Sequence, residues 1–254
     1  MRVREVLACQ LGRLDTADAH RSRIAIRRAR AVVRTTRPVL GDLLAPLDAE
    51  LHGLATLLAP IRELEVLLAH LEPQIAALGA ETDGGKLIVA TLERQLQFRR
   101  RDLDVAVDAE RLAALEAMFA TAIAAVDVPE KALRHEAMRE LARFCRAAPG
   151  LGHGPSDEEI HAIRVRARRA RHAVELLPGK QAKQCAKELR RVARLTGTHH
   201  DAVVAETRLR ALSRPKTALA VGRLVEREHA RRRAQLAVLP DALAAALSAC
   251  KRFR

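Results

Sequence analysis

Apolar residues recur at helical spacing along almost the whole chain, and this periodicity limits the possible fold more than any other feature. The clearest stretch places apolar residues three and four positions apart, at Leu54, Leu57, Leu58, Ile61, Leu64, Leu67, Leu68 and Leu71. Such spacing gathers apolar side chains on one face of an α-helix. No segment shows the convincing apolar/polar alternation of a half-buried strand. The predicted fold class is therefore all-α.

Proline, glycine and capping residues divide this pattern into helices joined by short turns. The most linker-like segment is Pro149–Asp157, which holds three Gly and two Pro. Ser156 and Glu159 have the spacing of a capping box, so a helix is expected to begin directly after Ser156. Long helices with short connections favour antiparallel bundles. Breaks are predicted at Asp15–Asp18, Pro38–Asp42, Pro73–Gly85, Val126–Glu130, Pro149–Asp157, Pro178–Gly179, Ser213–Pro215 and Leu239–Asp241.

The length and composition fit a globular helical protein. A chain of 254 residues, 49% of them hydrophobic, can bury a large core. There is no Trp or Tyr and only four Phe, so Ala, Leu and Val must build that core. No stretch approaches the roughly 20 apolar residues of a membrane span, and the N-terminus lacks the apolar region of a signal peptide. We expect a cytoplasmic protein with no membrane association.

The positive charge is concentrated in two short segments. The chain carries 45 Lys and Arg against 31 Asp and Glu, a formal net charge of +14. Residues 1–37 hold ten Arg against three acids, and residues 161–194 hold eleven basic residues against two acids. These two segments account for the whole excess, which a uniformly solvated helical surface would not produce. Position, more than composition, therefore indicates an anion-binding function.

The two basic segments contain an internal repeat. Residues 20–30 and 161–171 both read H-x-x-R-x-x-x-R-R-x-R, at a constant offset of 141. A fainter match pairs residues 61–66 with residues 199–204. Self-similarity of this kind indicates related structural units. The chain is interpreted as one domain, residues 1–254, built from repeat halves of about 1–148 and 149–254.

The basic residues of each repeat fall on one side of their helix. In the first helix they cover an arc of about 100°, and in the second Glu175 ends the row. Like charges three or four residues apart destabilise a helix by about 0.2–0.5 kcal/mol per pair, so an external polyanion is expected. A third helix adds another basic face. The candidate binding residues are His20, Arg23, Arg27, Arg28, Arg30, Arg34, His161, Arg164, Arg168, Arg169, Arg171, Lys183, Lys187, Arg190 and Arg194.

Beyond the two His/Arg helices, three short segments carry a resemblance to a known family. Residues 62–66, R-E-L-E-V, resemble the R-D-x-D-V motif of the CHAD (conserved histidine α-helical domain) family. Residues 195–201 resemble its L-G-x-x-x-D motif, and Lys251–Phe253 looks like its K-P-F ending. Glu63 stands at a usual Asp position and Arg252 at a usual Pro. The resemblance extends from about residue 5 to the C-terminus.

The resemblance implies both an architecture and a ligand. It implies two pseudo-symmetric antiparallel helical bundles of about four helices each, with basic residues lining a central groove or pore. It also implies binding of inorganic polyphosphate and a location at polyphosphate granules, where other granule proteins are possible partners. Arginine suits this ligand because its guanidinium donates paired, charge-assisted hydrogen bonds to phosphate oxygens.

The residues also bear on nucleic-acid binding, catalysis and metal binding. Nucleic-acid binding is the alternative that the charge allows, but the lack of Trp and Tyr removes most stacking platforms. An enzyme is not expected, since no nucleophile, paired base or built-in triphosphatase motif can be assigned. No metal or other cofactor is expected, because adjacent His199 and His200 point about 100° apart on a helix. His20 and His161 fit either a neutral donor to phosphate or a structural role.

Overall fold

The structure is a computed structural model that describes residues 2–14, 19–79, 82–152 and 154–253. All regular secondary structure in these residues is helical, which confirms the predicted all-α class. The break predicted at Asp15–Asp18 lies outside the described residues. A short 3₁₀ turn, Ala148–Gly150, follows the sixth α-helix. The α-helices are α1 (Arg2–Leu11), α2 (Ala19–Leu40), α3 (Ala45–Ala76), α4 (Thr82–Ala106), α5 (Ala109–Ala125), α6 (Glu130–Ala147), α7 (Asp157–Glu175), α8 (Lys180–Ala211) and α9 (Ala218–Phe253).

Local capping explains where several helices begin. The capping box predicted before α7 is confirmed: the Glu159 N–H donates to Ser156 Oγ at 3.2 Å, and the Ser156 N–H donates to Glu159 Oε2 at 2.8 Å. The Asp108 carboxylate caps α5 by accepting the N–H of Arg111 at 2.8 Å. The sequence analysis did not predict the break between α4 and α5. Asp108 was its signal, because a carboxylate at this position satisfies a free helical N–H.

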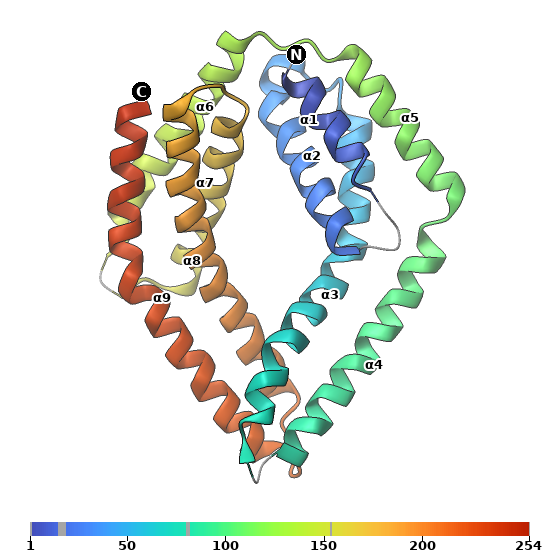
Figure 1. Ribbon diagram of the computed structural model, residues 1–254, viewed down its shortest axis with the longest axis vertical. Coiled ribbons are helices and arrows are strands. Elements are labelled where there is room, and N and C mark those ends of the chain that lie inside the picture. The colour runs from blue at the N-terminus through green and yellow to red at the C-terminus, as the bar shows by residue number, and fades with distance from the viewer. Residues whose placement is uncertain (1, 15–18, 80–81, 153, 254) are drawn as a thin grey trace.

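The break predicted at Leu239–Asp241 is wrong, because α9 continues through Pro240 as far as Phe253. An internal proline removes one backbone hydrogen bond and costs about 3 kcal/mol. Buried residues on both sides, including Leu239 and Leu243, pack into the core and offset that cost. Internal prolines also kink helices, and Figure 1 shows α9 changing direction between its lower and upper parts.

Two clusters of buried side chains hold the helices together. The smaller cluster joins α3, α4, α8 and α9, and includes Ile61, Leu71, Leu92 and Leu209. Figure 1 shows these four helices converging at the lower end of the molecule. The larger cluster draws on helices from both parts of the chain. In Figure 1, α6 to α9 lie on one side of the upper region, while α1, α2, α3 and α5 lie on the other.

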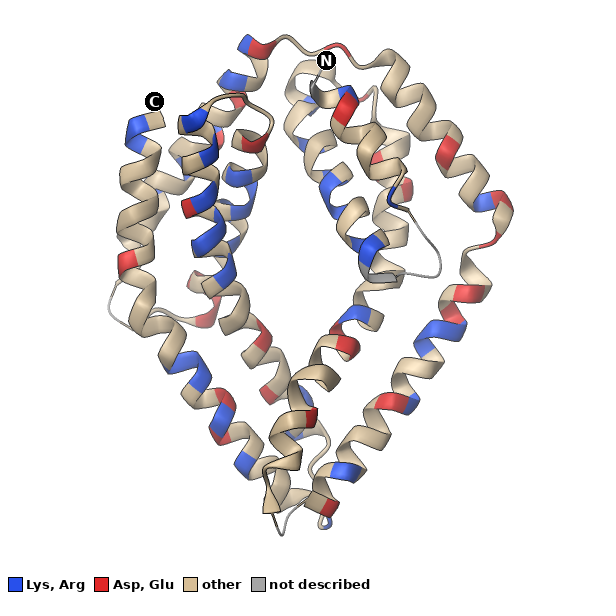
Figure 2. Cartoon of the chain, viewed as in Figure 1, with Lys and Arg blue, Asp and Glu red and all other residues tan. Residues whose placement is uncertain are grey.

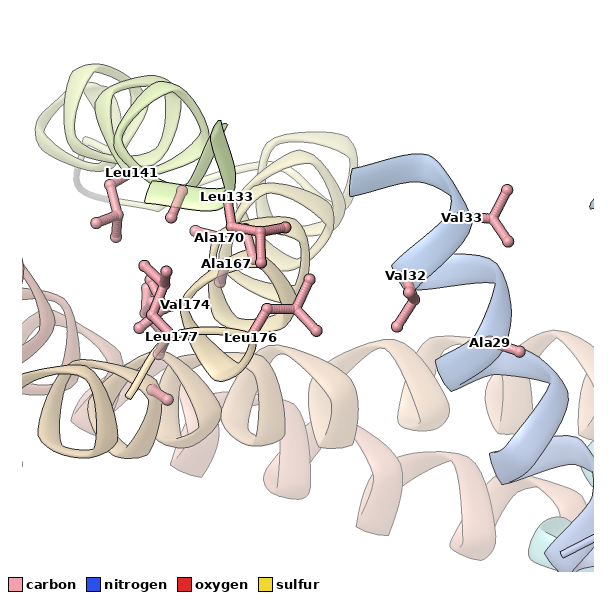
Figure 3. Close-up of a cluster of buried hydrophobic side chains, with 14 of the residues drawn as sticks. Ala29, Val32, Val33, Leu133, Leu141, Ala167, Ala170, Val174, Leu176 and Leu177 are labelled. Carbon is pink, nitrogen blue, oxygen red and sulfur yellow. The ribbon is translucent and has the colours of Figure 1, made fainter. Parts of the chain in front are cut away.

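Helix α2 lies against α7, which brings the two basic segments of the sequence together. Ala29 on α2 and Ala167 and Ala170 on α7 are fully buried, and all three belong to the larger buried cluster. Figure 3 shows Val32 of α2 and Leu176, which follows α7, pointing toward one another. Both belong to the larger buried cluster. The packing of α2 on α7 therefore fixes the relative position of their arginines.

The repeat halves share part of their helical order. In each half the His/Arg helix, α2 or α7, is followed by a helix of 32 residues, α3 or α8. Among the described residues, α1 to α6 precede residue 149 and α7 to α9 follow it, so the halves carry unequal numbers of helices. Pseudo-symmetry and the division at residue 149 remain predictions.

The described helices include no single segment long and apolar enough to cross a membrane. Helix α5 and the segment Glu130–Gly150 reach that length and apolarity only as a pair bent by 110°. Both contribute side chains to the larger buried cluster, Phe119 from α5 and Phe144 from α6.

The close approach of α4 to the start of α9 predicts different effects of alanine at two helical glycines. A β-carbon at Gly84 would lie 2.8 Å from the backbone oxygen of Lys216. At Gly222 it would meet no described atom within 4 Å outside its own helical neighbours. Alanine improves helix propensity at both sites, but only Gly84→Ala forces a backbone shift. We expect Gly84→Ala to have an unfolding free energy at least about 1 kcal/mol below that of Gly222→Ala, measured in urea. Equal values would contradict the contact.

Candidate functional site

The site begins with arginines at the edge of the buried faces of α2 and α7. On α7, Ile163, Ala167 and Ala170 are buried, and the next residue along the chain from each is an arginine. Five arginines, two on α2 and three on α7, are half-buried in this way: Arg23, Arg27, Arg164, Arg168 and Arg171. Figure 2 shows Lys and Arg along α2 and α7 on opposite sides of the centre of the molecule. The charges of the two predicted rows act on one another, since Arg27 on α2 is the foremost neighbouring charge at Arg168 on α7.

Four of these arginines lack a carboxylate partner. Within the described part of the chain, Arg23, Arg27, Arg164 and Arg168 make no ion pair or side-chain hydrogen bond. The Nε atoms of Arg27 and Arg164 are buried and have no acceptor. A buried donor without an acceptor costs about 1–3 kcal/mol, and more when it is charged. These guanidinium groups are therefore poised to donate to an anion.

Burial lowers the pKa of all four side chains, and repulsion from neighbouring arginines adds to this effect at Arg23, Arg27 and Arg168. The pKa of Arg27 falls to about 10, first because the side chain is buried and then because of four neighbouring positive charges, those of Arg23, Arg171, Arg164 and Arg28. Burial, with Arg27 foremost among the neighbouring charges, lowers the pKa of Arg168 to about 9. Burial is also the largest cause of the lowered pKa of Arg23, Arg34, Arg164 and Arg171. All remain charged at neutral pH, so the site concentrates positive charge away from water.

A cavity of about 360 Å³ opens between α2, α6 and α7. We call it the basic cleft. His172 is part of its lining. The charged residues of the lining are six arginines and two glutamates: Arg27, Arg34, Arg139, Arg143, Arg168, Arg169, Glu136 and Glu140. Guanidinium groups from three helices thus surround one space, which suits a ligand with several negatively charged oxygens.

Arg139 and Arg143, which α6 contributes to the basic cleft, were not predicted from the sequence. Each follows a glutamate by three residues and forms an ion pair with it, Arg139 with Glu136 and Arg143 with Glu140. This mixed charge resembles an ordinary solvated helix face. The spacing of Arg139, Arg143 and Arg146 by four and three residues was the available signal, because it places all three on one face.

Other predicted residues of the first repeat lie at the margin of the cleft or outside it. The Nε of Arg30 donates to Asp48 Oδ1 at 3.1 Å, so this side chain is held toward α3. Arg34 lines the cleft, and its Nε donates to the Arg30 carbonyl at 3.2 Å. Arg28 is exposed. His20 lies in the first turn of α2, and its side chain lies outside the described part of the structure.

Glu175 connects the basic face predicted on α8 to the arginines of α7. Arg190 donates to Glu175 Oε1 at 2.7 Å, while Arg171 Nε lies 3.6 Å from the same oxygen. Burial alone would raise the pKa of Glu175, but hydrogen bonds from His172 and Arg190 and the charge of Arg171 lower it to about 2. The other three residues of this face are exposed and make no ion pair within the described chain: Lys183, Lys187 and Arg194.

The second histidine of the repeat lies at the other end of the α7 row. The rings of His161 and His200 have centroids 5.3 Å apart. Burial, and then the charge of Arg164, lower the pKa of His200. Gly197 on α8 lies next to the Arg164 side chain, since a β-carbon there would be in van der Waals contact with Arg164 Nε at 3.6 Å. This end of the row is therefore more crowded and less exclusively basic.

The adjacent residue His199 points elsewhere. It is buried, and its Nε2 lies 3.5 Å from Asp157 Oδ1. Burial lowers its pKa. Across the described residues, no group of three or more His, Cys, Asp or Glu could hold a metal ion.

Glu63 accepts two hydrogen bonds from Arg208, at 2.8 and 3.0 Å, and so joins α3 to α8.

Comparison with known proteins identifies what the chain is similar to. The family model described as "CHAD domain" matches residues 2–210. The crystal structure of the CHAD domain from the plant Ricinus communis has a TM-score of 0.74 and 22% identity, covering 96% of this chain and 90% of that one. PptA from Streptomyces chartreusis has a TM-score of 0.69 and 22% identity, covering 95% and 97% respectively. No curated protein sequence gives a significant match. At these identities the two structures show a shared fold.

The low pKa of Glu175 predicts a pH-dependent contribution to stability. Because the folded pKa is about 2 and the ordinary value 4.5, the carboxylate stabilises the folded state above about pH 4.5. This contribution is lost as pH falls toward 2. We expect wild type to exceed Glu175→Gln in unfolding free energy by up to about 3 kcal/mol at pH 6, with the gap closing near pH 2. Urea unfolding at several pH values measures it. A gap that does not change with pH would contradict this assignment.

Proposed function

The chain belongs to the CHAD domain family, and we propose that it binds inorganic polyphosphate in the basic cleft between α2, α6 and α7. The observation that carries the proposal is the pair of half-buried arginines in the cleft lining, Arg27 and Arg168, which have no carboxylate partner among the described residues. Arg23 and Arg164, on the same two helices, also lack such a partner there. A polyanion would supply the acceptors that these guanidinium groups lack. The proposed role is binding without a chemical step, in the cytoplasm at polyphosphate granules, where other granule proteins are possible partners.

The geometry of the site supports a flexible linear polyanion. Arginines at helical spacing follow one another at about 5.4 Å per turn along each helix. Facing rows on α2 and α7 present donors to both sides of one chain of phosphates. Each phosphate contact is modest, but contacts along one polymer act together. Affinity should therefore grow with chain length and fall steeply as salt increases.

Nucleic-acid binding is the second candidate, and the net charge of +14 is the observation that favours it. A duplex cannot enter a cavity of about 360 Å³ and would have to lie across the surface. Single strands commonly bind through stacking of bases on aromatic side chains. The chain has no Trp or Tyr, and of its four Phe only Phe98 is among the exposed large hydrophobic residues. The narrow basic cleft favours a thinner polymer.

Removing the two central arginines tests the proposal. The double variant Arg27→Ala/Arg168→Ala should lose affinity for long-chain polyphosphate by about 100-fold or more, because each charge-assisted hydrogen bond contributes about 1.5–3 kcal/mol. Its unfolding free energy without ligand should fall by no more than about 1 kcal/mol, or should rise, since like charges are removed. Titration calorimetry and urea unfolding give the two readouts.

The matched control is Arg94→Ala/Arg101→Ala on α4, which also removes two positive charges. Both residues are exposed, and neither lines the basic cleft. Exposed charges farther than about 8 Å from a ligand are largely screened at physiological salt, so the control should bind within about threefold of wild type. Equal losses in both double variants would assign binding to net charge and overturn the proposed cleft. Wild-type affinity in Arg27→Ala/Arg168→Ala would also overturn it.

A further inference from the structure

A second hollow lies beside the basic cleft, lined by residues of α6 and α7 alone. Its volume is about 530 Å³, and we call it the outer groove. It shares three lining residues with the basic cleft, namely Glu140, Arg143 and Arg169. The remaining lining comes from Arg146, Ala147 and Arg166, all on α6 or α7. The two hollows therefore adjoin, and a chain leaving the cleft past Arg143 and Arg169 enters the groove.

The outer groove concentrates positive charge that the protein itself does not neutralise. Its lining has four arginines and one glutamate. Glu140 pairs with Arg143, whereas Arg146, Arg166 and Arg169 make no ion pair or side-chain hydrogen bond within the described chain. Arg143 and Arg146 are three residues apart on α6, and Arg166 and Arg169 are three apart on α7. Like charges at this spacing repel one another, so an anion in the groove would be stabilising.

The size of the basic cleft makes such a continuation necessary for a long polymer. At about 360 Å³, the cleft lies at the small end of the range for small-molecule pockets, which is roughly 300–1,000 Å³. A polymer of many phosphates cannot fit inside it and must extend beyond it. At the C-terminal end of α7 the row of arginines ends at Glu175, a carboxylate with a pKa of about 2 that stays negative at neutral pH. The cationic lining continues instead toward α6.

We propose that the outer groove is a second binding segment for condensed phosphate, engaged only by chains long enough to extend beyond the basic cleft. This inference rests on the proposed function and adds to it a basis for selecting chain length. Arg146 and Arg166 are its diagnostic residues, because they line the outer groove and do not line the cleft. A short condensed phosphate occupies the cleft alone, whereas a long chain contacts both sites.

The test compares Arg146→Gln/Arg166→Gln with wild type, using tripolyphosphate and long-chain polyphosphate as ligands. For the long chain, the affinity should fall about tenfold. The slope of log K against log salt should become shallower by about 1.4, as expected for two lost phosphate contacts on a single strand. For tripolyphosphate, the affinity should stay within about twofold of wild type. Helicity and thermal unfolding should match wild type, since both side chains are exposed and neither makes an ion pair or side-chain hydrogen bond among the described residues.

Two controls separate this proposal from the proposed function. Arg94→Gln/Arg101→Gln removes the same charge from α4 and should leave both ligands within about threefold of wild type. Arg27→Ala/Arg168→Ala should weaken both ligands. If that variant weakens binding while Arg146→Gln/Arg166→Gln matches the α4 control, the outer groove alone is overturned. Equal weakening of both ligands by Arg146→Gln/Arg166→Gln would also overturn it. If wild type fails to bind long-chain polyphosphate, both proposals fall.

Discussion

Repulsion among half-buried arginines is the interaction on which the account of this protein depends. Arg232 on α9 is neutralised by acidic partners: it donates two hydrogen bonds to Asp157, at 2.8 and 2.9 Å, and a third to Glu206 at 3.0 Å. Between α2 and α7 the opposite holds, since Arg27 and Arg168 face other arginines and their pKa values fall to about 10 and 9. The folded state tolerates this cost, and a bound polyanion would remove it.

The apolar packing holds these arginines in place despite their repulsion. Helix α2 contacts α7, and fully buried residues on both helices, among them Ala29, Ala167 and Ala170, belong to one apolar cluster. Apolar burial contributes about 25 cal/mol per Å² and does not depend on the charge state of the site. The cleft is therefore preorganised, and binding should require little ordering of the backbone. Preorganisation of this kind favours affinity, because fewer groups must be fixed when the ligand arrives.

The sequence predicted the features that depend on local pattern and missed those that depend on tertiary contacts. Helical periodicity gave the all-α class, and the Ser156/Glu159 spacing gave the start of α7. The repeat indicated the two arginine rows, which the fold places face to face. Arg30 pairs with Asp48, which lies on another helix, so no local sequence pattern predicts this ion pair. A break was predicted at Pro240 because proline usually ends a helix. Buried residues on both sides of Pro240 keep α9 continuous by packing against other helices, and the local sequence does not reveal those contacts. Arg139 and Arg143 were not predicted as site residues because each has a glutamate three residues before it, which is typical of an ordinary solvated helix face.

The most direct test is to titrate wild-type protein in parallel with long-chain polyphosphate, duplex DNA and single-stranded RNA, matched in phosphate concentration. At about 150 mM salt, charges separated by more than roughly 8 Å are screened, so general surface attraction contributes little. We expect long-chain polyphosphate to bind more tightly than either nucleic acid by orders of magnitude. Equal or tighter binding of DNA or RNA would contradict it and would make the arginine rows a general polyanion surface.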